Sequence, residues 1–273
     1  MRLNIHFPLI IHYNTMITNK TKFMSTKIIQ ITDLHLNKSK GMISNGINTL
    51  ESANMVIERI KINEKNMDCL ILSGDLSNDH SIESYNHLVH LLKDFETPIY
   101  LMSGNHDSPS LLKTLTINKN FFYKSFECFD NWGLFMFNTK KENSPNGVLY
   151  KEELKYFDRI LANESYKNIF IFLHHHPVPI GSDSMDSMII ENAELLTDRI
   201  KKYKKIKAVS WGHIHNEFYL NMGSAKLFST PSTCYQAKEK SKNFIIDTKA
   251  LPGYRKIVLN KDGSFDTEVI RIS

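Results

Sequence analysis

The sequence predicts an α/β fold, and two observations support this class. Short apolar runs typical of buried strands alternate with longer amphipathic segments typical of helices, as expected for strands joined by helical crossovers. Each apolar run is followed by a polar loop that contains Gly or Asp. Because open α/β sheets collect ligands at the carboxyl ends of their strands, these loops are where we expect a functional site.

The first half of the chain reads strand, helix, strand, helix, strand. The apolar runs predict strands, and the amphipathic stretches between them predict helices. In chain order the expected elements are a strand at 28–31, a helix at about 46–64, a strand at 69–72, a helix at about 81–95 and a strand at 99–102.

The second half is expected to be richer in strands. It has candidate strands at about 132–137, 169–173 and 208–210, a helix at about 191–203, and a hairpin turn at Asn260–Gly263. No Pro/Gly linker or repeat divides residues 24–273, so we expect one domain that starts near Met24. Residues 1–23 show no sustained period and are interpreted as an N-terminal extension, either disordered or translated from an upstream start.

The charge balance is compatible with most functions but argues against nucleic-acid binding. The chain has 34 Lys and Arg against 29 Asp and Glu, a net charge of +5 that could attract an anionic substrate. It lacks the broad basic stripes with interleaved aromatics that nucleic-acid binding requires. The basic run Lys201–Lys205 is interpreted as a solvated helix end, so no nucleic-acid partner is expected.

Cysteine usage and hydropathy indicate a cytoplasmic protein. Cys69, Cys128 and Cys234 are scattered and form no CxxC pair, so neither a disulfide framework nor a cysteine zinc site is expected. No stretch approaches the ~20 apolar residues that span a bilayer, so no membrane association is expected. The apolar run at 7–11 also lacks a signal-peptide cleavage region.

Five loops that follow predicted strands carry metal-ligating residue types. Seven of the twelve histidines lie in these loops, and such clustering is not expected if the histidines are scattered over the protein surface. The remaining candidates His80, His87 and His90 are expected on the surface of a polar helix. The five loops are Asp33-Leu34-His35, Gly74-Asp75, Gly104-Asn105-His106-Asp107, His174-His175-His176-Pro177 and Gly212-His213-Ile214-His215.

The mixture of carboxylate and imidazole is informative about the metal. It suits borderline and fairly hard divalent ions such as iron, manganese and zinc. Asp75, alone behind Gly74, is the natural carboxylate to bridge two ions. Asp33 and His35 are two residues apart and would point to the same side if the chain is extended there; His213 and His215 share that spacing.

The order of these motifs, from Asp33 to His215, resembles the calcineurin-type metallophosphoesterase superfamily. The resemblance implies a sandwich of two mixed β-sheets flanked by helices, with a dinuclear metal site at the carboxyl ends of the strands. It implies one metal held by Asp33, His35, Asp75 and His215, and a second held by Asp75, Asn105, His175 and His213. His175 is chosen because the family ligand lies two residues before a proline, here Pro177; His174 remains the alternative, and His176 is expected to line the site.

The same resemblance suggests catalytic roles. His106 is placed to stabilise the phosphoryl oxygens or to protonate the leaving alkoxide, and Asp107 could hold His106 in the required tautomer. The substrate phosphate is expected to contact the residues His35, Asp75, Asn105, His106 and His215.

Segments outside the ligands resemble the class III cyclic-nucleotide phosphodiesterases, and especially the bacterial ones that act on cyclic AMP. These segments are 174–182, Thr230–Cys234, Phe244–Thr248 and Pro252–Arg255. The resemblance implies two divalent metal ions, iron or manganese before zinc, and hydrolysis of 3′,5′-cyclic AMP to AMP. The rivals are phosphodiesterases that act on glycerophosphodiesters or 2′,3′-cyclic nucleotides, or a scaffold that has lost catalysis. The oligomeric state is left open.

Overall fold

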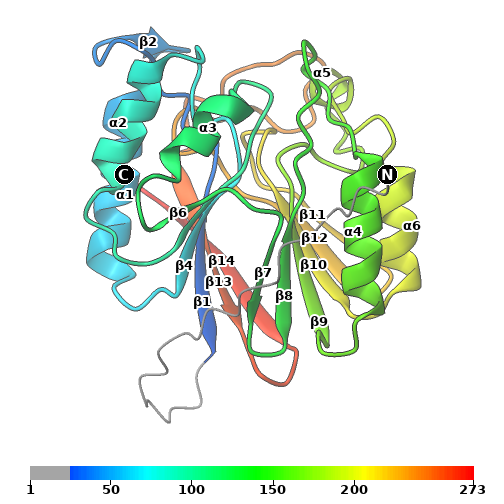
Figure 1. Ribbon diagram of the computed structural model, residues 1–273. Helices are drawn as coiled ribbons and strands as arrows, with labels where there is room; N and C mark the ends of the chain where they lie inside the picture. The colour runs from blue at the N-terminus through cyan, green and yellow to red at the C-terminus, as the bar shows by residue number, and fades with distance from the viewer. Residues whose placement is uncertain (1–24) are drawn as a thin grey trace, which may run out of the picture.

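The computed structural model describes residues 25–273, and within them two six-stranded sheets pack face to face (Figure 1). The first sheet has the order β14 (Phe265–Arg271), β13 (Gly253–Leu259), β1 (Thr26–Ile31), β4 (Cys69–Leu72), β5 (Ile99–Leu101) and β6 (Phe121–Phe122). The second has the order β11 (Tyr219–Met222), β12 (Ala225–Ser229), β10 (Ile206–Trp211), β9 (Asn168–Phe172), β8 (Trp132–Met136) and β7 (Phe126–Phe129).

Both sheets are mixed, and their central strands are parallel. In the first sheet β1, β4 and β5 run parallel to one another, while β13 and β14 are antiparallel. In the second sheet β8, β9, β10 and β12 are parallel, while β7 and β11 are antiparallel edge strands. The loops that follow parallel neighbours therefore emerge at one edge of each sheet.

Helices cover the outer face of each sheet (Figure 1). The first sheet carries α1 (Thr49–Asn63), α2 (Ile82–Leu92) and α3 (Pro109–Leu115), and the second carries α4 (Lys151–Ala162) and α6 (Glu194–Lys202). Along β1 the side chains alternate: Ile28 enters the core between the sheets, whereas Ile29 and Ile31 pack under the helices. The predicted α/β class, with two mixed sheets flanked by helices, is confirmed.

The predicted elements are all present, most of them with shifted ends, and the strand predicted at 69–72 has the expected bounds. The helix expected from residue 46 begins at Thr49, because the side chain of Asn48 accepts hydrogen bonds from the backbone of Leu50 and Glu51. Residues 43–48 form a small hairpin of β2 (Ile43–Ser44) and β3 (Ile47–Asn48) instead. The predicted turn at residues 260–263 joins β13 and β14.

Several elements were not predicted from the sequence. They are the helices α3, α4 and the short α5 (Asp183–Asp186), and the strands β6, β7, β11 and β12. The proposed extension at residues 1–23 and the start at Met24 lie outside the described residues. Within the described part, no helix combines the length and the apolar character needed to cross a bilayer.

Candidate metal centre

The five predicted loops meet at one edge of the sandwich. The first sheet contributes Asp33 and His35 after β1, Asp75 after β4, and the Asn105–Asp107 loop after β5. The second contributes the histidines His174–His176 after β9 and His213 and His215 after β10. Four groups of these side chains have ligand atoms within 4.8 Å of one another. Loops far apart in sequence therefore form one site.

The backbone of this site is unusual. It places five non-glycine residues in the left-handed region: Asp33 (φ 54°), His35 (45°), Asp75 (51°), His213 (67°) and His215 (51°). The side chains of Asp33 and His35, and those of His213 and His215, are therefore not brought to the same side by an extended backbone. Such conformations cost of order 1–3 kcal/mol each and persist only where the surroundings enforce them.

Hydrogen bonds between loops enforce this conformation. The backbone amide of Asp33 donates to the carbonyl of Gly74 at 3.0 Å, and that of His35 donates to the carbonyl of Asp75 at 2.9 Å. The carboxylate of Asp33 accepts from the amide of His213 at 2.9 and 3.1 Å. The first two strand ends are thus joined to each other and to the second sheet.

The first cluster of candidate ligands is Asp33, His35 and His215. The Nε2 atoms of the two histidines lie 3.1 Å apart, and Nε2 of His215 lies 3.5 Å from Oδ1 of Asp33. Nδ1 of His215 is 2.8 Å from the carbonyl of Tyr235. Because a carbonyl only accepts, Nδ1 carries the proton, and the lone pair of Nε2 points into the cluster.

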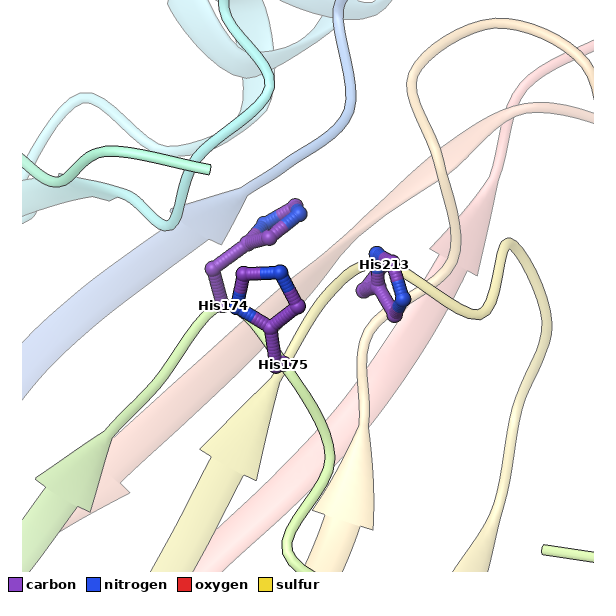
Figure 2. A group of neighbouring side chains, drawn as sticks. All are labelled: His174, His175 and His213. Atoms are coloured by element: carbon purple, nitrogen blue, oxygen red, sulfur yellow. The ribbon is translucent and has the colours of Figure 1, made fainter. Parts of the chain in front are cut away.

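The second cluster comes from the ends of β9 and β10, and Figure 2 shows its three rings, His174, His175 and His213, gathered from those two loops. Nε2 of His174 lies 3.3 Å from Oδ2 of Asp75 and 3.2 Å from Oδ1 of Asn105. Its Nδ1 lies 2.9 Å from the carbonyl of Ser73, which fixes the Nδ1 proton.

The other two rings of this cluster have free nitrogens. Nδ1 of His175 contacts Oγ1 of Thr139 at 2.8 Å, which leaves its Nε2. Within the described residues, the buried Nε2 atoms of His175 and His213 have no hydrogen-bond partner. Burial and the charge of neighbouring histidines hold the pKa of both rings well below the usual value, so they are neutral, as a metal ligand must be.

Asp75 contacts both clusters. Its Oδ2 lies 3.6 Å from Nε2 of His35 and 3.3 Å from Nε2 of His174, while Oδ1 accepts from the backbone of His106 at 2.8 Å. Burial acts to raise the pKa of Asp75, but the positive charge and hydrogen bond of His174 outweigh it and hold that pKa well below the usual range. This carboxylate is therefore ionised and shared between two groups of imidazoles.

The residues present fit a pair of divalent cations. Buried carboxylates and imidazole lone pairs converge, and two of those imidazole nitrogens lack any partner in the described part of the chain. Asp75 raises the pKa of His174 to about 9 against the effect of burial, so this ring holds a proton that a cation would displace. The donor set is oxygen and nitrogen without thiolate, which suits iron, manganese or zinc.

Two glycines make this close approach possible. A Cβ on Gly74, at φ +100°, would lie 2.5 Å from Nδ1 of His174. A Cβ on Gly104 would collide with the carboxylate of Asp75 and with the ring of His174. Any side chain at either position would push apart the groups that bring the two clusters together.

The loop after β5 differs from expectation in one respect. The carboxylate of Asp107 accepts hydrogen bonds from the amides of Leu76, Ser77 and Gly104 and from the hydroxyl of Tyr85, at 2.9–3.2 Å. Nδ1 of His106 instead lies 3.3 Å from the carbonyl of Asn78. The expected contact between Asp107 and His106 is therefore absent among the described residues, because backbone donors occupy the carboxylate.

Asp107 instead joins the loops after β4 and β5. Burial and then the charge of Asp75 raise its pKa to about 6, against the effect of its backbone hydrogen bonds. His176, expected to line the site, is fully buried; its Nε2 lies 3.4 Å from Asp186, and its ring stacks on His213 with centroids 5.7 Å apart. His176 thus packs against the ring of the candidate ligand His213.

An open cavity of about 870 Å³ adjoins Asn105 and His106. Its other walls include His80, Lys113 and Lys140, none of which was singled out from the sequence as part of the site. Nζ of Lys140 donates to the carbonyl of Asn105 at 2.8 Å. His80 was expected on a helix but precedes α2, which begins at Ile82. Only the fold reveals these residues, because no motif surrounds them.

Comparison with known proteins agrees with this geometry. A family model described as calcineurin-like phosphoesterase matches residues 26–217. The chain is 34% identical over 248 residues to the 3′,5′-cyclic adenosine monophosphate phosphodiesterase CpdA of Escherichia coli, covering 90% of each chain. It is 31% identical over 261 residues to the CpdA of Pseudomonas aeruginosa, covering 96% of this chain and 94% of that relative.

Solved structures share the fold at low sequence identity. A dimetal phosphatase from Danio rerio superposes with a TM-score of 0.63 at 12% identity, covering 91% of this chain and 99% of that one. A purple acid phosphatase from yellow lupin superposes with a TM-score of 0.60 at 14% identity, covering 90% of this chain and 54% of that one.

Proposed function

Because this chain belongs to the calcineurin-like phosphoesterase family, we propose that it is a metal-dependent phosphodiesterase that hydrolyses 3′,5′-cyclic AMP to AMP. The observation that carries the chemistry is the pair of ligand clusters that share the carboxylate of Asp75. The choice of substrate draws on relatives named for cyclic AMP that match the chain over about 90% of its length.

We assign the ligands as follows. One metal would be held by Asp33, His35, Asp75 and His215, and the other by Asp75, Asn105, His213 and one histidine of the loop after β9. For that last position His174 is favoured over the His175 expected from the distance to Pro177, because Nε2 of His174 lies beside both Asp75 and Asn105. The metals are iron or manganese before zinc, since carboxylate, amide and imidazole make up the set.

When bound, a pair of divalent ions lowers the pKa of a water for attack on phosphorus and offsets charge on the phosphate. The protein's own groups then act on the substrate. We propose that the phosphate lies against His35, Asp75, Asn105, His106 and His215.

His106 is the proposed general acid. The carbonyl of Asn78 holds the Nδ1 proton of His106, which leaves Nε2 to face the substrate. The protonated ring donates from Nε2 to the 3′ oxygen as the bond between that oxygen and phosphorus breaks, so that the 3′ oxygen becomes a free hydroxyl group while the 5′ ester still joins the ribose to the phosphate. Asp107 acts on this step only through the backbone, since it fixes the turn at Gly104 that carries Asn105 and His106.

In the cell this activity lowers the concentration of cyclic AMP. We propose a cytoplasmic enzyme whose partner is the cyclic nucleotide, with neither nucleic acid nor a membrane required.

The test is a comparison of initial rates with manganese- or iron-loaded protein. The substrates are 3′,5′-cyclic AMP, 3′,5′-cyclic GMP, 2′,3′-cyclic AMP, a glycerophosphodiester and bis(4-nitrophenyl) phosphate. We expect the highest kcat/KM with 3′,5′-cyclic AMP. If cyclic AMP is no better than the generic diester, the named substrate is wrong while the class of reaction stands.

A further inference from the structure

An aromatic corner defined by Tyr235 and Phe244 lies beside the candidate ligand His215. The ring of Tyr235 stacks on that of His215 with centroids 4.7 Å apart and an angle of 13°. The ring of Phe244 stands at 90° to His215 and at 87° to Tyr235, with centroids 6.0 and 6.3 Å away. Tyr235 is only 6% exposed, whereas Phe244 is 41% exposed. Phe244 thus exposes apolar ring surface to solvent and is in contact with His215, a candidate metal ligand.

Backbone hydrogen bonds fix the position of this corner. The amide of Ala237 donates to the carbonyl of His215 at 2.9 Å, and that of Asp247 donates to the carbonyl of Gln236, also at 2.9 Å. Residues Ala237 and Ile246 form an antiparallel bridge, which closes the loop that carries Phe244. Phe244 is therefore held in register with His215, so the substrate meets an aromatic group that is already in place.

We propose that Phe244 is the stacking platform for the nucleobase of the substrate, with Tyr235 packed behind it. This inference rests on the proposed function, because it takes the phosphate to lie against His35 and His215. A base attached to the ribose of that phosphate then reaches the open part of the Phe244 ring. Aromatic faces stack on any base, and such contacts are sequence-tolerant, which predicts a preference for nucleotides over base-free phosphates more than for one purine over another.

The rival position for the base is the 870 Å³ cavity beside Asn105 and His106. Its lining is mostly polar or charged, with Lys113, Lys140 and Glu142 among the residues, and its only aromatic rings are the imidazoles of His80 and His106. A base placed there would meet no ring larger than an imidazole, and His106 is already assigned to the scissile bond. The basic cavity suits anionic phosphate and its hydration instead, so the aromatic corner is the better site for the base.

The test measures binding and does not depend on turnover. The dissociation constants of AMP and of ribose 5-phosphate, which differ only by the adenine, are determined by calorimetry on manganese-loaded protein. We expect wild type to bind AMP more tightly, and Phe244→Ala to weaken AMP binding by about 5- to 100-fold while leaving ribose 5-phosphate unchanged. Phe244→Trp should retain the preference, and Phe244→Leu should lose most of it.

Controls separate the possible failures. Leu251→Ala, which removes a side chain that is 43% exposed on the same connection to β13, should change neither constant. The inference is overturned if Phe244→Ala keeps the full preference for AMP, or if Lys113→Ala abolishes it in place of Phe244→Ala. Absence of cyclic AMP hydrolysis by wild type would count against the proposed function alone, since the preference for AMP over ribose 5-phosphate is measured independently.

Discussion

The two sheets supply different kinds of ligand to the candidate metal centre. The loops after β1, β4 and β5 of the first sheet bring both candidate carboxylate ligands, Asp33 and Asp75, together with His35 and Asn105, whereas the loops after β9 and β10 of the second sheet bring imidazoles alone. The carboxylates accept hydrogen bonds from backbone amides, as Asp33 does from His213. Among the described residues, Nε2 of His175 and of His213 has no partner.

This difference shows which charges are already in place at the site before a cation binds. Backbone donors fix the carboxylates of Asp33 and Asp75 in place without any cation, and the low pKa of Asp75 means that its negative charge is already positioned. In the imidazole half, His175 and His213 are neutral and His174 is protonated, and the free lone pairs of His175 and His213 are directed at the same region. We expect loss of an acid to abolish metal binding, and loss of an imidazole to weaken it by a smaller factor.

The largest effect is expected from the carboxylate that joins the halves. Asp75→Asn keeps the shape but removes the charge that faces both His35 and His174. We expect the metal content to fall below one ion per chain and kcat/KM to fall by about 10³-fold or more. Elemental analysis and initial rates check this, with the exposed Asp94→Asn as the matched control. Two bound metals and a rate within 10-fold of wild type would contradict the shared role.

The next effect separates catalysis from metal binding within the first sheet. His106→Ala removes the proposed acid but none of the proposed metal ligands. We expect kcat to fall by ~10²–10⁴-fold while the metal content stays at the wild-type level. His90→Ala, on the exposed side of α2, is the control. A parallel loss of metal and activity in His106→Ala would show that this residue binds metal and would refute its role as an acid.

A smaller effect distinguishes two neighbours in the second sheet. His174→Ala removes the ring beside Asp75, and His175→Ala removes one that bonds to Thr139. We expect metal affinity to fall by about 100-fold in the first variant and by about 10-fold in the second, as for loss of an outer partner. Titration with manganese in competition with a chelator measures both. The reverse order would assign the ligand position to His175.

The smallest effect is expected from Glu153 in α4, a helix that packs on the second sheet. Glu153 of α4 accepts only from Ser125 and the amide of Asn138, its Oε2 has no partner among the described residues, and burial raises its pKa to about 6. A raised acid pKa lowers stability once the group ionises, so the penalty is absent well below pH 4.5 and complete above about pH 6. Glu153→Gln should therefore stabilise the fold by about 1–2 kcal/mol at pH 8 and by much less at pH 4.5.

Urea unfolding of wild type and Glu153→Gln at the two pH values gives that difference, and the titration of other acids cancels between the two proteins. Equal gains at both pH values would show that packing, and not ionisation, is responsible.

More of the candidate site than of the fold can be predicted from the sequence. The five loops are predictable because ligand types recur directly after apolar runs, and parallel strands bring their ends together. Helix α4 was missed although Leu154, Phe157 and Leu161 repeat at helical spacing, because Tyr150 at its start supplies no capping side chain. The pairing of β11 with β12 depends on contacts across the sheet, which local patterns do not record.

Other features depend on tertiary structure alone. The preference for His174 over His175 as the proposed ligand rests on which ring faces Asp75, and the distance to Pro177 contains no such information. The contact expected between Asp107 and His106 is absent among the described residues, because the amides of Leu76 and Ser77 donate to the carboxylate of Asp107 instead. Lys140 lines the cavity only because the loop after β8 returns to Asn105.

The left-handed backbone at five candidate ligands also limits how this site could be re-engineered. Among non-glycine residues, Asp, Asn and His enter that conformation most readily, and they are the residue types found there. A designer who wanted a softer metal would introduce Cys or Met, which do not share that tolerance. The same would hold for Glu as a longer carboxylate. The chain conformation therefore restricts the choice of ligands, and with it the metals, before any coordination bond forms.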